Sequence, residues 1–595
     1  MPKSLLRRYP DQIFGACFLL LNCLLFLPAY LLNLDDTTLL PVAEWLGRDI
    51  GLDWQRLLIW RTNLDPWRWN IELILLVALW VNVAYVRRRW LRNLLAAIYL
   101  FTVAYYSYEA LMVAIYQNEP NFYSHYYLAL DGLHFLLEHL QLSLLIYLVG
   151  ALGIVTVFVV LYGLARLLYH IPLAAALSPW TRRGVGVLAV AALVAIVTLQ
   201  QTLALPSMVA SSLVYKVKAN LQRSFQLYAE VTRFDDTQLQ QVYNYGDQGL
   251  RHKPNLYLIF VESYGSVLYK RPDYRSYYGA ILRQLQDRLD GAGWQAVSAL
   301  SESPTWGGGS WLAYTSALFG LHIDNHPEYL TLFNKYQHAT YPHLGNFLKT
   351  QGYRDYFLSS ISNELSDSDW LNYQRFYNAD RWIRYQDLNY QGQLYGWGPS
   401  PADQYVLNYA RELIHQETAE PFMLFFITQN SHYPFAPIPT FVDDWRTINQ
   451  SDPAAPSAPT FDAEQISHNL RRQNYANAIH YELDTLIDFV LRAGDEDAIF
   501  VFIGDHQPPR VSRRADDLST PIHIVSRDPQ LLAALQQYGF EPGLQVTNLE
   551  PALKHEGLYS LLAQTLTTVY GSGQHAHAPV YLPDGFVVEH QAMTQ

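Results

Sequence analysis

The chain has 595 residues, of which 50% are hydrophobic and 16% are charged. Soluble domains carry about 25% charged residues, so a large part of this chain is predicted to face a membrane rather than water. The formal net charge of −12 argues against a nucleic-acid binder. The two cysteines, Cys17 and Cys23, are too few for a disulfide framework or a cysteine zinc site. Because one hydrophobic core stops growing near about 250–300 residues, we expect at least two folding units.

Most of the apolar residues precede residue 206. Spanning a bilayer takes about 20 apolar residues. Five stretches approach or exceed that length, at 13–32, 70–86, 94–116, 142–168 and 185–205, and the second is the shortest. Buried helices of a soluble core are the alternative, but five of them so close together leave little chain to cover them. We therefore predict a bundle of five transmembrane helices.

Lysine and arginine set the predicted orientation of these spans, because cytoplasmic loops are rich in both residues. They gather in the N-terminal tail, in the turn after the second span and around the turn after the fourth span, at Lys3, Arg7, Arg8, Arg87, Arg88, Arg89, Arg92, Arg166, Arg182 and Arg183. These three segments lie on one side of a five-span protein. The N-terminus is therefore predicted to be cytoplasmic. Because the number of spans is odd, everything after residue 205 is predicted to lie on the outer side of the membrane.

Three regions follow from this pattern. Residues 1–206 are the predicted five-span domain, 207–250 an amphipathic helical linker, and 251–595 an outer domain that alternates short apolar runs with helical patterns. Such alternation is typical of an α/β domain with a mainly parallel sheet. Glu109 falls inside the third span, where it either faces a cavity or partner or lies close enough to the interface to be hydrated. The sequence favours neither alternative.

Three almost continuously apolar runs in the outer domain cover residues 255–261, 421–428 and 498–503, as expected for strands buried on both faces. Each is followed by polar residues, namely Glu262, His432 with the preceding Asn430-Ser431, and Asp505-His506. Parallel sheets bind ligands beyond the carboxyl ends of their strands, so these side chains are expected to meet at one edge. Each one alone could be a solvated loop residue. Together, two carboxylates and an imidazole favour a site for Mn²⁺, Mg²⁺ or Zn²⁺.

A glycine run, Gly307–Gly309, leads through Ser310 into a helical pattern. A purely structural role for Ser310 is that of a helix N-cap, which is the commonest role for serine in that position. Beside a metal site, Ser310 is instead predicted to be a nucleophile that attacks phosphorus, with the helix start favouring the negative phosphoryl oxygens.

The order of these motifs resembles the lipoteichoic acid synthase branch of the alkaline phosphatase/sulfatase superfamily, a family of membrane phosphotransferases. The resemblance is carried by the spans, the linker, the strand-end Glu262, the glycine turn before Ser310, the run Asn-Ser-His-Tyr-Pro-Phe at 430–435 and Gly-Asp-His at 504–506. It implies an alkaline-phosphatase-like fold and one divalent ion, Mn²⁺ before Mg²⁺ or Zn²⁺. The implied metal ligands are Glu262, Ser310, Asp505 and His506, and the implied contact to the substrate phosphate is His432.

The sequence departs from that branch at two places. The synthases carry threonine where Ser310 stands, and serine is chemically equivalent there. They also follow a substrate-binding tryptophan with an arginine two positions later, whereas Trp370 is followed by Leu371 and Asn372, and the nearest arginine is Arg375. Trp370 is retained as a predicted substrate contact, but a glycerophosphate headgroup is put in doubt. No formylglycine motif occurs near 301–312, so sulfate-ester hydrolysis is not expected.

The resemblance implies a multi-pass enzyme of the bacterial inner (plasma) membrane with a periplasmic or extracellular catalytic domain. It would move a phosphoglycerol or phosphoethanolamine group from a phospholipid donor, through Ser310, to a glycan or lipid acceptor of the cell envelope. A hydrolase that uses water as the acceptor is one alternative. A non-catalytic protein that binds an envelope polymer is another.

Overall fold

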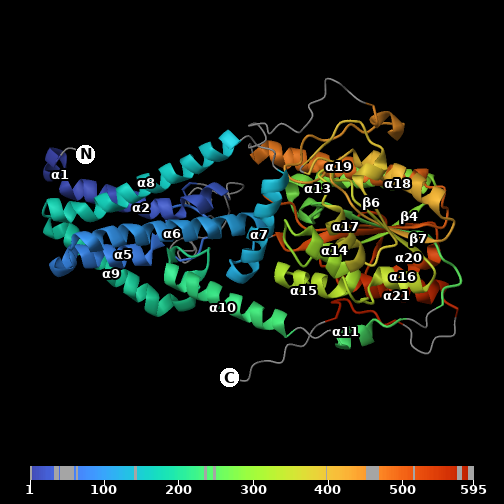
Figure 1. Cartoon of the computed structure of the whole chain (residues 1–595), viewed down its shortest axis with the longest axis horizontal. Coiled ribbons are helices and arrows are strands. Elements are labelled where there is room, and N and C mark those ends of the chain that lie inside the picture. The colour runs from blue at the N-terminus through green and yellow to red at the C-terminus, as the bar shows by residue number, and fades with distance from the viewer. Residues whose placement is uncertain are drawn as a thin grey trace. The chain divides into compact units, whose positions relative to one another are not determined.

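The structure is a computed structural model that describes residues 3–32, 39–40, 59–61, 64–139, 144–233, 237–245, 249–396, 398–450, 468–512, 516–572 and 579–586. The chain divides into two compact units, Met1–Ala229 and Glu230–Gln595, which we call the helical unit and the sheet unit (Figure 1).

Four segments of the helical unit are long and apolar enough to cross a membrane. They are α2 (Pro10–Leu32), α6 (Arg89–Tyr116), Tyr147–Ala174 within α8 (Leu144–Ala174), and Pro179–Ala204, which joins α9 (Pro179–Leu199) to the 3-10 turn η2 (Gln200–Ala204). Valine and leucine side chains of α8 and α9 are exposed on the outside of the bundle. An apolar surface of this kind is suited to contact with lipid. A helix can enter the bilayer core because its backbone hydrogen bonds are satisfied within the helix and its apolar side chains need no water.

The remaining predicted span, 70–86, contains α5 (Ile71–Asn82) and the 3-10 turn η1 (Ala84–Val86). A helix of 12 residues is about 18 Å long, which is shorter than the roughly 30 Å hydrocarbon core. Arg87 lies beyond the end of α5, and its side chain donates back to two backbone oxygens of the last turn, that of Trp80, at 2.8 Å, and that of Val81. Most α5 side chains are buried against α8 and α9. Four of the five predicted spans therefore have the length of a membrane helix, and the fifth is a short buried helix.

The other elements of the helical unit are α1 (Lys3–Arg8), α7 (Phe122–His139), α10 (Leu213–Thr232), and the short parallel pair β1 (Trp69–Asn70) and β2 (Ala210–Ser211). Polar side chains of α10 bind the segment before α7. Asn220 Oδ1 accepts from the backbone N–H of Phe122 at 2.7 Å, and Arg223 donates to the Pro120 oxygen at 3.2 Å. These bonds attach the predicted linker to the bundle.

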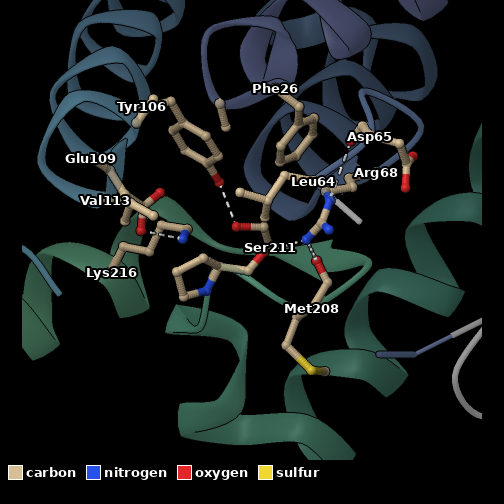
Figure 2. Close-up of a pocket in the computed structure, with 13 residues that line it drawn as sticks. Phe26, Leu64, Asp65, Arg68, Tyr106, Glu109, Val113, Met208, Ser211 and Lys216 are labelled. Carbon is tan, nitrogen blue, oxygen red and sulfur yellow. Dashed lines mark hydrogen bonds and ion pairs between the residues drawn. The ribbon is translucent and has the colours of Figure 1, made fainter. Parts of the chain in front are cut away.

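A buried polar cluster fixes α10 to α6 (Figure 2). The Lys216 ammonium donates to Glu109 Oε1 at 2.6 Å and to the Ala204 oxygen at 3.0 Å, and the Tyr106 hydroxyl bonds Ser211 Oγ at 2.8 Å. These groups border a cavity of about 30 Å³. Of the two alternatives for Glu109, the structure therefore supports a buried carboxylate with a partner.

The sheet unit is built on a nine-stranded sheet, with strand order β10-β4-β9-β8-β3-β7-β5-β6 and with β11 beside β4. Five neighbouring strands run parallel, from β8 (Ile499–Gly504) through β3 (Leu256–Val261), β7 (Phe422–Ile427) and β5 (Arg354–Leu358) to the edge strand β6 (Arg381–Ile383). On the other side, β9 (Ser519–Ser526) is antiparallel to β8 and to β4 (Gln295–Glu302). The short strands β10 (Glu541–Pro542) and β11 (Leu553–Lys554) complete the sheet. The predicted mainly parallel sheet is present.

Helices cover both faces of the sheet, because alternate strand residues point to opposite sides. Tyr257 and Ile259 of β3 pack in one core with α13 (Pro272–Gly291), α18 (Asp403–Glu417) and α19 (His468–Arg492). Leu258 and Phe260 pack in a second core with α14 (Ser310–Phe319), α15 (His326–Tyr336), α16 (Leu344–Thr350) and α21 (Gly557–Tyr570). Figure 1 shows these two helical layers on either side of the strands.

The remaining elements of the sheet unit are short. They are α11 (Thr237–Val242), α12 (Val267–Lys270), α17 (Asp367–Phe376), α20 (Pro529–Gln536), η3 (Tyr385–Leu388) and η4 (Trp445–Ile448).

Candidate metal and phosphoryl-transfer site

Three predicted ligands meet at the carboxyl edge of the sheet. Strands β8 and β7 both pair with β3, so Glu262, Asp505 and the segment before His432 emerge side by side. One ligand atom each from Glu262, Asp505 and His506 lies within 4.8 Å of the others, and all three residues are buried. Two carboxylates and an imidazole form a donor set that suits a divalent cation.

The orientation of these side chains also fits a cation. Asp505 Oδ1 accepts from the backbone N–H groups of Ser263, at 2.7 Å, and His506, at 2.6 Å. Its second oxygen, Oδ2, is buried and has no hydrogen-bond donor within the described residues. His506 Nδ1 lies 2.9 Å from the Gln507 oxygen and donates to it, so the lone pair of Nε2 faces the two carboxylates. A divalent ion would satisfy both exposed lone pairs.

The pKa shifts of Glu262, Asp505 and His506 indicate how much negative charge a bound cation would have to balance. Burial raises the pKa of Glu262, but the neighbouring imidazoles of His432 and His506, together with hydrogen bonds, outweigh it and leave that pKa below the ordinary value. Burial, reinforced by the charge of Glu262, raises the pKa of Asp505 well above its ordinary range. Burial lowers the pKa of His506. Without a cation, the pair of carboxylates therefore holds one negative charge, whereas a divalent cation would let both ionise.

Ser310 lies beside this cluster. It is the first residue of α14, and Gly309 occupies the N-cap position, so Ser310 is not the cap. Its Oγ donates to Glu262 Oε2 at 3.0 Å and lies 3.3 Å from His506 Nε2. The preceding Gly308 has φ of 63°, a left-handed conformation that favours glycine. The turn thus directs a half-buried hydroxyl at the predicted metal ligands.

His432 follows β7 and is half-buried. Its Nδ1 donates to the Tyr433 oxygen at 2.7 Å, and its ring is an electrostatic neighbour of both Glu262 and His506. The neighbouring Ser431 donates to the backbone oxygen of Glu262 at 2.7 Å, which fixes the segment to the end of β3. His432 therefore belongs to the same edge of the sheet.

Trp370 lies in a different environment. It is on α17, where its ring lies 5.5 Å from the ring of Trp382 and 6.4 Å from that of Tyr373. The guanidinium of Arg384 lies over the Trp370 ring at 5.9 Å. No recorded contact within the described residues joins Trp370 to Ser310 or to the three metal ligands. The cation beside Trp370 is thus Arg384, which precedes η3, and not Arg375 of α17 itself.

Sequence reasoning missed Ser263 and Arg384. Ser263 has φ of 59° and presents its N–H to Asp505, and its Oγ donates to Glu262 Oε1 at 2.9 Å. A non-glycine residue in the left-handed region often marks a functional site, but no sequence pattern announces it. Arg384 is 14 positions from Trp370 in the chain, and only β6 brings the two together.

Residues 254–537 match the family model described as Sulfatase. The matched segment lies within the sheet unit. This match confirms the resemblance to the alkaline phosphatase/sulfatase superfamily, and every predicted site residue lies inside the matched segment. A comparison with curated proteins finds no match.

Three of the solved structures that are similar to this chain share little sequence identity with it. The lipoteichoic acid synthase LtaP of Listeria monocytogenes shares 16% identity with a TM-score of 0.34, over 56% of this chain and 78% of that chain. The soluble domain of lipooligosaccharide phosphoethanolamine transferase A of Neisseria meningitidis shares 12% with a TM-score of 0.35, over 55% and 92%. The phosphoglycerol transferase GacH of Streptococcus pyogenes, in complex with sn-glycerol-1-phosphate, shares 13% with a TM-score of 0.33, over 57% and 80%.

Proposed function

We propose that this protein is a membrane-anchored, metal-dependent phosphotransferase of the lipoteichoic acid synthase type. The observation that carries the proposal is the position of Ser310 Oγ, 3.0 Å from Glu262 Oε2 and 3.3 Å from His506 Nε2, beside the unpartnered Oδ2 of Asp505. A hydroxyl at a helix start next to a cation site is the arrangement that nucleophilic attack on phosphorus requires.

The proposed metal ligands are Glu262, Ser310, Asp505 and His506, and the proposed ion is Mn²⁺, with Mg²⁺ or Zn²⁺ as alternatives. The ion, when bound, supplies positive charge that favours the alkoxide form of Ser310. His432 is proposed to bind the phosphoryl oxygens of the substrate. Trp370, with Arg384 over its ring, is proposed to contact the headgroup that is transferred.

The reaction balances as two displacements at one phosphorus. Ser310 Oγ loses its proton to solvent and bonds to phosphorus while the bond to the diacylglycerol oxygen breaks, and His432 donates a proton to that leaving oxygen. A hydroxyl of an envelope glycan or lipid then bonds to the same phosphorus and gives its proton to His432, while the bond to Ser310 Oγ breaks and Ser310 Oγ regains a proton from solvent. The headgroup, phosphoglycerol or phosphoethanolamine, is thereby moved without net hydrolysis.

The helical unit is proposed to place this chemistry at a membrane, where the lipid donor is. Residues 1–206 are proposed as five spans, of which four are full-length helices and the other is the short helix α5, which crosses inside the bundle where its neighbours bury most of its side chains. Residues 207–250 are proposed as the linker and 251–595 as the catalytic domain. The clustering of positive charge supports a cytoplasmic N-terminus, because Arg87 lies near Arg182 and Arg92 near Arg166. The catalytic domain is then periplasmic or extracellular in a bacterial inner membrane.

The test uses the full chain purified in detergent, with fluorescent phosphatidylglycerol or phosphatidylethanolamine as the donor and Mn²⁺, Mg²⁺ or Zn²⁺ added in turn. We expect release of fluorescent diacylglycerol. Ser310→Ala should abolish it, Ser310→Thr should retain it, and the matched control Ser276→Ala, at an exposed position of α13, should leave it unchanged. Turnover by Ser310→Ala at the wild-type rate would refute the proposed nucleophile.

Two outcomes separate the alternatives. Free headgroup phosphate as the sole product, at a rate that added acceptor does not change, identifies a hydrolase. A wild-type protein that turns over no donor, together with envelope effects that Ser310→Ala does not alter, identifies a polymer-binding protein.

A further inference from the structure

Two buried carboxyl groups behind the site have no role in the reaction above. Asp403 is the first residue of α18, and Glu482 lies in the middle of α19. Neither side chain is exposed to solvent. No arginine, lysine or histidine pairs with either one in the part of the chain that the structure describes. Buried carboxylates without a cation are costly, so their presence calls for a physical explanation.

Asp403 is bonded to the segment that carries His432. Its Oδ2 accepts from the backbone N–H of Gln429 at 2.7 Å and from that of Asn430 at 2.9 Å. In return, Asn430 Oδ1 accepts from the backbone N–H of Asp403 at 2.7 Å, and Asn430 Nδ2 donates to the Pro401 oxygen at 3.2 Å. The start of α18 and the end of β7 are therefore joined by four hydrogen bonds.

Glu482 completes the arrangement from the opposite helix. Its carboxyl group lies within hydrogen-bonding reach of the Asp403 carboxyl and close to the backbone N–H groups of Asn430 and Ser431. Despite these neighbours, Asp403 Oδ1 and both oxygens of Glu482 receive no well-aligned hydrogen bond from any described residue. A proton on one group, donated to the other, pairs two of these three oxygens and leaves only the carbonyl oxygen of the neutral group, which costs less to bury than a carboxylate oxygen.

The direction of each pKa agrees with this geometry. Burial raises the pKa of Asp403 to about 6, although its backbone hydrogen bonds oppose the change. Burial, and next the charge of Asp403, raise the pKa of Glu482 well above the ordinary range. Two close carboxyl groups titrate as a pair, and the one with more hydrogen-bond donors keeps the charge. Glu482 is therefore the protonated member.

We propose that Asp403 and Glu482 share one proton and act as positioning residues, holding the end of β7 so that His432 points at the phosphoryl group. The inference deepens the proposed function and rests on it for the role of His432. The neutral Glu482 donates to the Asp403 carboxylate, which holds Gln429 and Asn430, and Ser431 then binds the end of β3. A misplacement of about 1 Å at a reacting group can lower a rate 100-fold, so this clamp acts on kcat.

Four variants of the full-length protein test the pair. Glu482→Gln keeps a neutral donor to Asp403, so its kcat should stay within about threefold of the wild type. Glu482→Ala and Asp403→Ala remove one member of the pair, so each should lose about 10- to 100-fold in kcat with little change in KM. Glu412→Gln is the matched control, because Glu412 of α18 is exposed and pairs with Arg446. Equal losses in Glu482→Gln and Glu482→Ala would overturn the shared proton.

An infrared measurement tests the proton without any substrate. Other buried carboxyl groups also absorb as neutral acids, because the pKa values of Asp355 and Glu328 are raised too, so each variant spectrum is compared with that of the wild type at neutral pH. The Glu482→Gln spectrum should lose the band of one buried carboxylic acid that Glu412→Gln retains. An unchanged carbonyl region in Glu482→Gln would refute the proposal. If the wild type turns over no lipid donor but Glu482→Gln loses the band, the proposed function fails and the proton-sharing pair stands. Thermal melting of each variant identifies any that fail to fold.

Discussion

The substitution Gly504→Ala tests whether the packing behind the metal ligands sets their positions. Gly504 is the last residue of β8 and precedes Asp505, and the backbone of Tyr264 crosses directly against it. A methyl group at Gly504 would overlap the Tyr264 carbonyl oxygen, and it would lie 2.9 Å from that carbonyl carbon and 3.0 Å from Thr520 Cβ. Ordinary carbon contacts are about 3.5–4.0 Å, and the overlap with the oxygen is the most severe of the three, so the two backbone segments have to separate by more than about 1 Å.

That separation moves the metal ligands apart, because Asp505 follows Gly504 and Glu262 is two residues before Tyr264. Overpacking of this kind costs about 1–3 kcal/mol in unfolding free energy. Metal sites lose about 10- to 100-fold in affinity when the groups that orient their ligands are disturbed. We therefore expect Gly504→Ala to melt at a lower temperature and to bind Mn²⁺ or Zn²⁺ at least 10-fold more weakly by titration calorimetry.

The matched control is Gly494→Ala, because a methyl group at Gly494 meets no atom within 4 Å. It should melt and bind metal as the wild type does. If Gly504→Ala binds the ion as tightly as Gly494→Ala, the close contact between Gly504 and Tyr264 does not set the ligand positions, and the reasoning is refuted.

Three further predictions concern stability and the ion. Burial lowers the pKa of His523 from 6.5 to about 3, so as the pH falls the unfolded chain protonates this histidine before the folded protein does. The free energy of unfolding should therefore decline below about pH 6.5, and the loss from this group should reach about 5 kcal/mol near pH 3. The melting temperature of His523→Gln, which cannot titrate there, should decline less steeply with pH. Lys216→Met leaves Glu109 buried without its cation and should cost about 3–5 kcal/mol, part of which the double variant with Glu109→Gln recovers; equal melting temperatures of single and double variants would contradict this. Chelation of divalent ions should abolish turnover and lower the melting temperature, and Mn²⁺ should restore both, whereas full activity after exhaustive chelation would exclude the proposed site.

The sheet and its three ligand-bearing strands could be predicted because their signals are local. The apolar runs that became β3, β7 and β8 are nearly continuous, and a strand buried on both faces requires such a run. Polar residues directly after them could then be placed at one edge, since parallel strands end together. The roles of Glu262, Asp505, His506 and Ser310 stay predictions, but their proximity follows from this rule.

The short span was less predictable. Its apolar stretch continues to residue 86, but the helix α5 ends at Asn82, where Arg87 reaches back to the backbone oxygen of Trp80. Hydrophobicity alone cannot locate such an end, because the bond that closes the helix comes from a side chain beyond it. The partner of Glu109 was also undetermined, since Lys216 is more than 100 residues away.

The sequence by itself determined the division into an apolar helical part and an α/β part, and the polar residues that end each buried strand. Periodicity and run length carry this information, because burial imposes them residue by residue. Only the tertiary structure decided which distant groups meet: Ser310 with Glu262, Arg384 with Trp370, and Asp403 with Glu482. Such contacts depend on the crossing of whole elements, and the free energy of a buried charge is set by its neighbours in space rather than in the chain.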